Sequence, residues 1–267
     1  MRYLSDYHVH SDFSFDGKAP AEDIVLSAIA KGIDEICFTE HCECSYYPLD
    51  QNCEYDVFAT EYLLLRDKYG DKIKIKIGIE IGQAMQNPAY AAKILDNEFD
   101  FILASYHNLA DMPDFAFIDY DTADIPALLH RYFDETYEMV CQGGFDCVGH
   151  LTYPLRYMAI AGYKPDLTPF MDKIEKIFLH IIKSGCGIEI NTSGLRNASG
   201  MFMPEANLIK FYRSLGGEII TTGSDSHTSE DIGAGILDAQ AVIKSAGLNS
   251  FCVYEKRVPK FIEIGDE

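Results

Sequence analysis

Two short segments near the ends of the chain constrain its fold more than any other feature. Asp6-Tyr7-His8-Val9-His10 lies near the N-terminus, and Gly223-Ser224-Asp225-Ser226-His227 lies near the C-terminus. Each ends an apolar run with two metal-binding residue types at positions i and i+2, and such side chains project from the same face of a strand. The two pairs predict a barrel whose first and last strands meet around a metal centre.

Apolar β-type segments alternate with amphipathic helical segments along the chain, which is typical of βα units around a parallel sheet. The expected strands are residues 3–8, 35–40, 72–81, 99–106, 145–149, 187–190 and 218–222. Residues 251–254 and 258–264 are expected to form either an eighth strand or a closing tail. A chain of 267 residues suits one α/β barrel, so we expect a single domain over residues 1–267.

Residues of metal-binding type fall at the ends of successive expected strands. They are His8 and His10, His41, Glu80, His107, His150, and Asp225 with His227. Active sites of α/β barrels lie at the carboxyl ends of the strands. Histidine combined with carboxylates suits Zn, Mn or Fe, so the pattern predicts a catalytic metal centre at this rim. His130 and His180 fall in expected helices and are not expected to be ligands.

The eight cysteines do not form a C-x-x-C pair, and a disulfide framework is not expected in a chain of this size without a secretion signal. Several lie in apolar runs, which suits buried reduced thiols. Cys42 and Cys44 follow His41 closely and leave two interpretations open. They are zinc ligands, or they are thiols near the rim of the site, and the second interpretation is favoured.

Composition excludes several classes of protein. The formal net charge of −20 disfavours a nucleic-acid partner, because phosphate backbones bind basic surfaces. No apolar run approaches the roughly 20 residues of a membrane span, and no signal-peptide core follows the N-terminus. We therefore expect a soluble, cytoplasmic protein without a membrane partner, while the oligomeric state is not determined. Metal ions and one or two arginines can still create a locally positive pocket for a small anionic substrate.

The motifs resemble those of the polymerase and histidinol phosphatase (PHP) family of metal-dependent phosphoesterases. The segment from His8 to Gly17 is similar to the first family motif, H-x-H followed by S-x-D-G. Thr39-Glu40-His41 is similar to the second. The later motifs match in order at Gly78-Ile79-Glu80, Ser105-Tyr106-His107, Gly149-His150 and Gly223-Ser224-Asp225-Ser226-His227. The resemblance covers nearly the whole chain and implies a distorted seven-stranded (β/α) barrel.

The resemblance also implies three divalent metal ions, which are Zn, Mn, Fe or a mixture. One ion is expected on His8, His10, Glu80 and Asp225. A second is expected on His107, His150 and a bridging Glu80, and a third on Asp16, His41 and His227. Asp225, His227 and Glu80 are the expected catalytic residues. Paired metal ions can clamp the attacking and leaving oxygens of a phosphoryl transfer, and they make water nucleophilic near neutral pH.

Three further residues are expected to bind substrate. Arg156 and Arg196 are placed in loops after the fifth and sixth strands, and a guanidinium group matches the geometry of a phosphate. Asn191 ends the sixth strand. For the arginines the alternative is an ordinary surface position, and for Asn191 it is the orientation of a metal ligand or a backbone contact.

The stand-alone histidinol-phosphatase branch of the family gives the best resemblance in length and in the loops that carry the two arginines. It implies hydrolysis of L-histidinol phosphate to L-histidinol and phosphate in histidine biosynthesis. Three alternatives remain open. The first is a phosphoesterase for a nucleotide, a sugar phosphate or a phosphotyrosyl protein, the second is a metal-binding barrel without turnover, and the third is an amidohydrolase-type C–N hydrolase. The third ranks last, because the corresponding strand ends carry Glu80 and His107 in place of a lysine.

Overall fold

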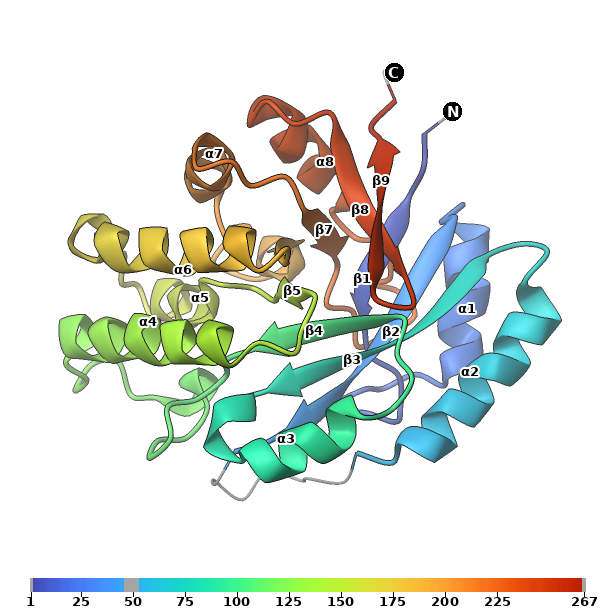
Figure 1. Ribbon diagram of the computed structural model, residues 1–267, viewed down its shortest axis with the longest axis horizontal. Coiled ribbons are helices and arrows are strands. Elements are labelled where there is room, and N and C mark those ends of the chain that lie inside the picture. The colour runs from blue at the N-terminus through green and yellow to red at the C-terminus, as the bar shows by residue number, and fades with distance from the viewer. Residues whose placement is uncertain (1, 46–52, 266–267) are drawn as a thin grey trace.

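The structure is a computed structural model that describes residues 2–45 and 53–265. Within these residues, seven parallel strands form one sheet whose spatial order follows the order of the sequence (Figure 1). The strands are β1 (Ser5–Val9), β2 (Glu35–Glu43), β3 (Lys74–Gly82), β4 (Phe101–Ser105), β5 (Cys147–Val148), β6 (Gly187–Asn191) and β7 (Ile220–Gly223). Because parallel neighbours require crossover connections, this order arises from a helix or loop between each strand and the next.

The sheet closes into a distorted barrel where β7 meets β1. The backbone N–H of Asp225 donates to the carbonyl of His8 at 2.8 Å, and the N–H of His10 donates to the carbonyl of Ser226 at 2.8 Å. Val9 and Ser226 form an isolated parallel bridge. The seven-stranded (β/α) barrel predicted from the sequence is therefore confirmed. The single domain over residues 1–267 stays a prediction.

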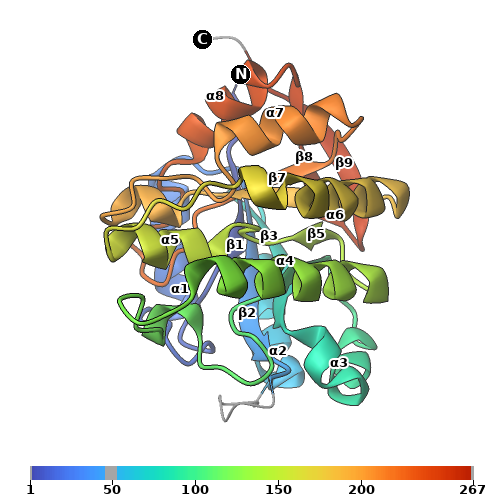
Figure 2. The same cartoon turned by 90° about the vertical axis from the view of Figure 1, so that its left-hand side faces the viewer.

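Helices surround the barrel (Figures 1 and 2). Their buried apolar residues pack against it. They are α1 (Ala21–Ala30), α2 (Tyr55–Tyr69), α3 (Pro88–Leu95), α4 (Ile125–Gln142), α5 (Tyr153–Ile160), α6 (Met171–Lys183), α7 (Ala206–Ser214) and α8 (Ile236–Ser245). In α6 the residues at helical spacing, Ile174, Ile177, Phe178 and Ile181, are fully buried. None of the helices in the described part of the chain is long and apolar enough to span a bilayer.

Four 3₁₀ helices lie in the described connections. They are η1 (Ala84–Gln86), η2 (Phe115–Phe117), η3 (Thr168–Phe170) and η4 (Ser193–Arg196). Two of them, η2 and η4, follow the carboxyl ends of β4 and β6. Phe115–Phe117 begins after Asp114, whose carboxylate accepts the N–H of Ala116 at 2.6 Å. This local cap is typical of an aspartate that precedes a helical turn.

Two expectations from the sequence were wrong in ways that matter for the site. The strand expected at residues 35–40 continues to Glu43, because β2 pairs with β3 without interruption and places His41 opposite Glu80. The loop expected from Cys42 onward is correspondingly shorter, and residues 46–52 lie outside the described part. Arg156 lies on α5 rather than in a loop. Pro154 lies in the first turn of this helix, where proline is common, so it could have indicated a helix at this position.

The C-terminal segment resolves the choice between an eighth strand and a tail. Strands β8 (Ser250–Glu255) and β9 (Val258–Glu263) form a separate antiparallel hairpin. Its tip reaches the amino-terminal ends of the barrel strands. The ring of Tyr254 lies 4.9 Å from that of Phe101, and Arg257 pairs with the buried Asp146 just before β5. The hairpin covers the end of the barrel opposite the metal-binding residues.

This closure gives a prediction about stability. Tyr254→Ala removes a fully buried ring whose hydroxyl also lies near Cys147, so we expect a loss of about 3–5 kcal/mol in the free energy of unfolding. Phe261→Ala on the same hairpin removes a ring that is 51% exposed and should cost less than about 1 kcal/mol. Urea denaturation of both variants measures the difference, and equal losses would contradict the proposed closure.

Candidate metal centre

The carboxyl ends of the strands bring together all nine side chains expected to bind metal. They are His8, His10, Asp16, His41, Glu80, His107, His150, Asp225 and His227, and each has a nitrogen or oxygen atom within 3.7 Å of another member. Two hydrogen bonds between β1 and the segment after β7 align the first and last of these residues. The meeting of the first and last barrel strands, predicted from the sequence, is confirmed.

One group of four donor atoms lies at the junction of β1, β3 and β7. Glu80 Oε2 lies 3.3 Å from His8 Nε2 and 3.5 Å from His10 Nε2. Asp225 Oδ1 lies 3.7 Å from each of these nitrogens. Donor atoms that share an ion with bonds of about 2.1 Å are about 3.4 Å apart in tetrahedral geometry. The four atoms therefore enclose a space of the size that one divalent cation needs.

A second group uses the other oxygen of the same glutamate. Glu80 Oε1 lies 2.8 Å from His150 Nε2 and 3.3 Å from His107 Nε2. The two nitrogens are 3.2 Å apart, and they come from the segments after β4 and β5. Because Glu80 turns one oxygen to each group, its carboxylate has the geometry of a bridge between two cations.

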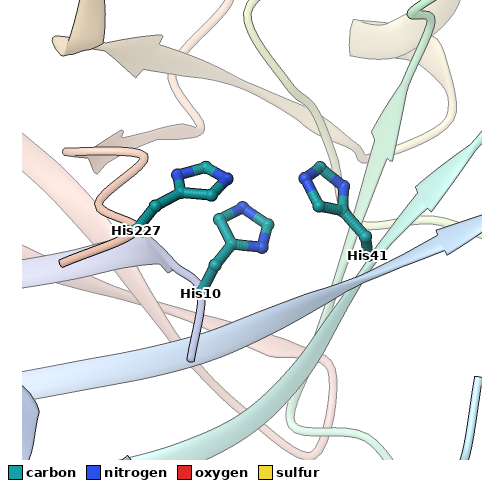
Figure 3. A group of neighbouring side chains, drawn as sticks. All are labelled: His10, His41 and His227. Atoms are coloured by element: carbon teal, nitrogen blue, oxygen red, sulfur yellow. The ribbon is translucent and has the colours of Figure 1, made fainter. Parts of the chain in front are cut away.

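A third group lies nearer to the mouth of the barrel. Asp16 Oδ1 lies 3.5 Å from His41 Nε2, and Asp16 Oδ2 lies 3.2 Å from His227 Nε2. Figure 3 shows the rings of His10, His41 and His227 turned toward one another from three separate segments. The ring centroid of His10 lies 4.2 Å from that of His41 and 4.3 Å from that of His227. Stacked imidazoles of this kind leave their nitrogen atoms available at the ring edges.

The donor set fits divalent metal ions. His8 Nε2, His10 Nε2 and Glu80 Oε2 are buried and have no hydrogen-bond partner among the described residues. Unsatisfied buried polar atoms cost about 1–3 kcal/mol each, so three such atoms that face one another indicate a missing common partner. Imidazole nitrogens with carboxylate oxygens are the ligands preferred by zinc and neighbouring transition metals.

The carboxylates and imidazoles of the cluster shift one another's pKa values. Burial alone would raise the pKa of Glu80, but the imidazoles of His8, His107 and His41 hold it well below its usual range. Burial and the neighbouring imidazoles hold the pKa of His10 well below its usual value. Metal ligands must be ionised carboxylates and neutral imidazoles, and the shifts of Glu80 and His10 favour these states. The buried acids act in the opposite direction on His8, His41 and His107: although burial opposes it, they raise the pKa of each imidazole well above its usual value, so metal binding there would release protons.

Two buried acids that the sequence analysis did not identify support the imidazoles from behind. Glu189 Oε1 accepts a hydrogen bond from His8 Nδ1 at 2.7 Å, and Glu43 Oε1 accepts one from His107 Nδ1 at 3.0 Å. The His107 imidazole lowers the pKa of Glu43 to about 2 although burial opposes this. These bonds leave Nε2 of each ring free to bind a cation, which is a common arrangement in metalloproteins.

The sequence offered a signal for one of these two acids. Glu189 is the charged residue of an otherwise apolar expected strand, two residues before Asn191. Glu43 falls in the loop that was expected after His41, and only the pairing of β2 with β3 places it on a strand. A glycine on the neighbouring segment makes room for each carboxylate. A Cβ at Gly82 would lie 2.2 Å from Glu43, and a Cβ at Gly223 would lie 2.2 Å from Glu189.

The backbone around Asp225 is held in an uncommon conformation. Asp225 has a φ of 55°, in the left-handed region that a non-glycine residue rarely adopts. The buried carboxylate of Asp6 accepts hydrogen bonds from the N–H and hydroxyl of Ser224, at 2.8 and 2.5 Å, and from the N–H of Gly233 at 2.8 Å. These bonds fix both ends of the segment that presents Asp225 and offset the strain.

A cavity of about 400 Å³ opens above the cluster. Glu80, Asp225 and His227 lie on its wall, together with Arg156. The Arg156 guanidinium donates to Ser193 Oγ at 2.8 Å, and its Nη1 lies 3.5 Å from Asp225 Oδ2. The cavity therefore places a fixed positive charge beside the proposed ligands, and its volume suits a small molecule.

The other two expected substrate-binding residues occupy different places. Arg196 Nη2 donates to the carbonyls of Ser224 and Asp225, at 2.8 and 3.2 Å, and does not line the cavity as the structure describes it. Asn191 is fully buried behind His8, and its Nδ2 lies 3.4 Å from His8 Nδ1. Both positions suit a role in orienting proposed metal ligands, Asp225 for Arg196 and His8 for Asn191. Substrate binding by these two residues stays a prediction.

The two histidines of the helices lie apart from the cluster, as expected. His130 packs against Phe170, and His180 lies 3.7 Å from Cys141 between α4 and α6. Cys42 and Cys44 are buried free thiols, and the groups of described residues that could hold an ion contain no cysteine. This agrees with the interpretation of the two cysteines as thiols near the rim.

Barrel, cluster and cavity together define a metal-dependent hydrolase of the PHP type. The PHP domain model matches residues 6–193, and the chain belongs to this family. It is 32% identical over 256 residues to the probable histidinol-phosphatase of Thermotoga maritima, covering 96% of this chain and 97% of that protein. It is 29% identical to the histidinol-phosphatase of Lactococcus lactis, covering 93% of each.

A solved structure agrees with these sequence relationships. The histidinol phosphate phosphatase of Lactococcus lactis, crystallised with zinc, L-histidinol and phosphate, superposes with a TM-score of 0.84 at 27% identity. The superposition covers 96% of this chain and 98% of that chain. The barrel described above is thus shared with a phosphatase along nearly its whole length.

The supporting role of Glu189 is testable. Glu189→Gln keeps the shape of the side chain but weakens the acceptor for His8 Nδ1, so we expect a 10–100-fold loss of metal affinity. Glu218→Gln makes the same substitution at a side chain that is 59% exposed and paired with Arg213, and it is the matched control. Metal content after dialysis against a graded series of chelator concentrations measures the effect. Equal retention in both variants would contradict the role of Glu189.

Proposed function

We propose that the protein is a metal-dependent phosphatase that hydrolyses L-histidinol phosphate to L-histidinol and phosphate in histidine biosynthesis. The observation that carries the proposal is the cavity above the ligand cluster, which combines cation sites with the fixed guanidinium of Arg156. The relatives that extend over nearly the whole chain are named histidinol-phosphatases, and a solved relative contains zinc, L-histidinol and phosphate. Their names support the choice of substrate.

We assign the three groups of donor atoms to three divalent ions of Zn, Mn or Fe. The first ion takes His8, His10, Glu80 and Asp225. The second takes His107, His150 and the other oxygen of Glu80, and the third takes Asp16, His41 and His227. The assignment is supported by the separation of 2.8–3.7 Å between donor atoms within each group. Glu80 would hold the first two ions together, because its two oxygens face different groups of donor atoms.

When bound, such ions supply Lewis-acid polarisation of the phosphoryl group and lower the pKa of water into the neutral range. The protein itself positions the substrate and complements its charge. Arg156 is suited to hold phosphate oxygens, because its guanidinium group is a planar donor matched to them. It is held in place by the hydroxyls of Ser193 and Tyr157, at 2.8 and 2.7 Å, and its Cζ lies 4.8 Å from the ring centre of Tyr153.

The cavity wall also suits the non-phosphate part of the substrate. Phe15 and Phe117 line it and are 59% and 76% exposed, so they offer aromatic faces to an imidazole ring. Asp114 lines the same wall, and its carboxylate is fixed by the N–H of Ala116 at 2.6 Å. We propose that this carboxylate pairs with the ammonium group of histidinol. Glu80, Asp225 and His227 remain the catalytic candidates, because they line the cavity in which we propose that the phosphoryl group binds.

A substrate panel tests the proposed reaction. We expect metal-loaded protein to release inorganic phosphate from L-histidinol phosphate with a kcat/KM about 100-fold above that for nucleotides, sugar phosphates or phosphotyrosyl peptides, about 2.7 kcal/mol of discrimination. Asp225→Asn, which removes a proposed ligand, should lose metal and activity together. Equal turnover across the panel would support a phosphatase but contradict L-histidinol phosphate as its specific substrate. Bound metal without any turnover would favour the non-catalytic barrel.

The role of Arg156 is tested separately. Arg156→Met keeps the length of the side chain but removes the charge-assisted donors, so we expect kcat/KM to fall by about 10²–10³ while metal content is unchanged. Arg213→Met removes an arginine that is 37% exposed and paired only with Glu218 in the described part of the chain. This variant should behave as wild type. Loss of metal from Arg156→Met would show that the residue acts on the ligands and not on the phosphate.

A further inference from the structure

Ser14 occupies a position that the metal centre described above does not explain. It is buried, it lies in the segment that resembles the S-x-D-G motif, and its hydroxyl contacts three groups at once. Ser14 Oγ lies 2.5 Å from Glu40 Oε2 and 3.1 Å from His10 Nδ1, and it accepts the N–H of His41 at 3.0 Å. The hydroxyl therefore links a buried acid to one proposed ligand and to the backbone of another.

The number of protons determines the direction of these bonds. A serine hydroxyl has one proton and two acceptor lone pairs. Glu40 receives the N–H of Ser11 at 3.0 Å and the hydroxyl of Tyr62, so it acts as an acceptor, and the short contact assigns the Ser14 proton to it. The two lone pairs of Ser14 then accept the N–H of His41 and the Nδ1–H of His10.

This direction fixes the tautomer of His10. With its proton on Nδ1, the ring directs the Nε2 lone pair toward Glu80 and Asp225, at 3.5 and 3.7 Å, where no hydrogen-bond donor is described. His8 and His107 achieve the same state by donating directly to a carboxylate. His10 has no acid within direct reach of Nδ1 in the described structure, and Ser14 provides the connection to one.

We propose that Glu40 and Ser14 act as a positioning pair that sets the tautomer of His10 and thereby holds the first metal ion. The bond from the His41 N–H places the same hydroxyl at the third group of ligands. The inference rests on the proposed metal centre and is independent of the substrate.

The tautomer can be observed directly in the wild-type holoenzyme. Long-range ¹H–¹⁵N correlation spectra of zinc-loaded protein distinguish the two ring nitrogens of each histidine. We expect the His10 proton on Nδ1, protected from exchange, and Nε2 without a proton. A proton on Nε2 would overturn the proposal without the need for any variant. A wild-type protein that binds no zinc would overturn the metal centre and this inference with it.

A matched pair of variants tests the energetic consequence. Ser14→Ala should lower the affinity for one equivalent of zinc by 10–100-fold in chelator competition. Ser11→Ala removes the same group from a buried residue of the same segment, but its hydroxyl contacts Tyr62 at 3.0 Å and no histidine. It should retain zinc within about twofold of wild type. Equal zinc loss from both variants would reduce Ser14 to a packing role.

Zinc retention and the tautomer are both measured without phosphate release. A protein that shows the expected spectrum and the expected zinc loss, yet hydrolyses no phosphoester, would leave this inference standing and overturn the proposed function. Phosphatase activity with a proton on His10 Nε2 would do the reverse. The two proposals therefore fail separately.

Discussion

The cluster of metal-binding side chains depends on Glu80, a fully buried residue whose pKa is held well below its usual value by the surrounding imidazoles. An unpaired buried carboxylate costs several kcal/mol, so it persists only where opposite charge or hydrogen-bond donors surround it. Here the hydroxyl of Ser105 lies 2.5 Å from one oxygen, and imidazoles from four segments approach both oxygens. The order of the strands and the pairing of His41 opposite Glu80 bring these groups to one point.

A second layer of acids determines how the imidazoles are presented. Glu189 and Glu43 receive Nδ1–H groups directly, and Glu40 is connected to His10 through Ser14. The centre therefore gathers several buried carboxylates, with the guanidinium of Arg156 on the wall of its cavity. Divalent ions would offset part of this negative charge and would make the cavity locally positive in a chain with a net charge of −20.

The sequence was sufficient for the strands and for most of the side chains that gather in the cluster, because both follow local rules. The i, i+2 spacing of His8 and His10 and the apolar runs before His107 and His150 are properties of single segments. Local rules failed where pairing or packing decided the outcome. The end of β2 is extended by its ladder with β3, although the composition after His41 is typical of a loop. The hairpin of β8 and β9 likewise depends on contacts with strands far away in the sequence.

By itself, the sequence determined the barrel, the end of the barrel that carries the site and the chemical type of the ligands. These follow from hydrophobic periodicity and from residue types at strand ends. Only the tertiary structure decided which atoms of Glu80 face which imidazoles, that Arg196 contacts the backbone of Asp225, and that Glu189 supports His8. Such relations join residues that are distant in the sequence. Their distances depend on register and packing, which no single segment encodes.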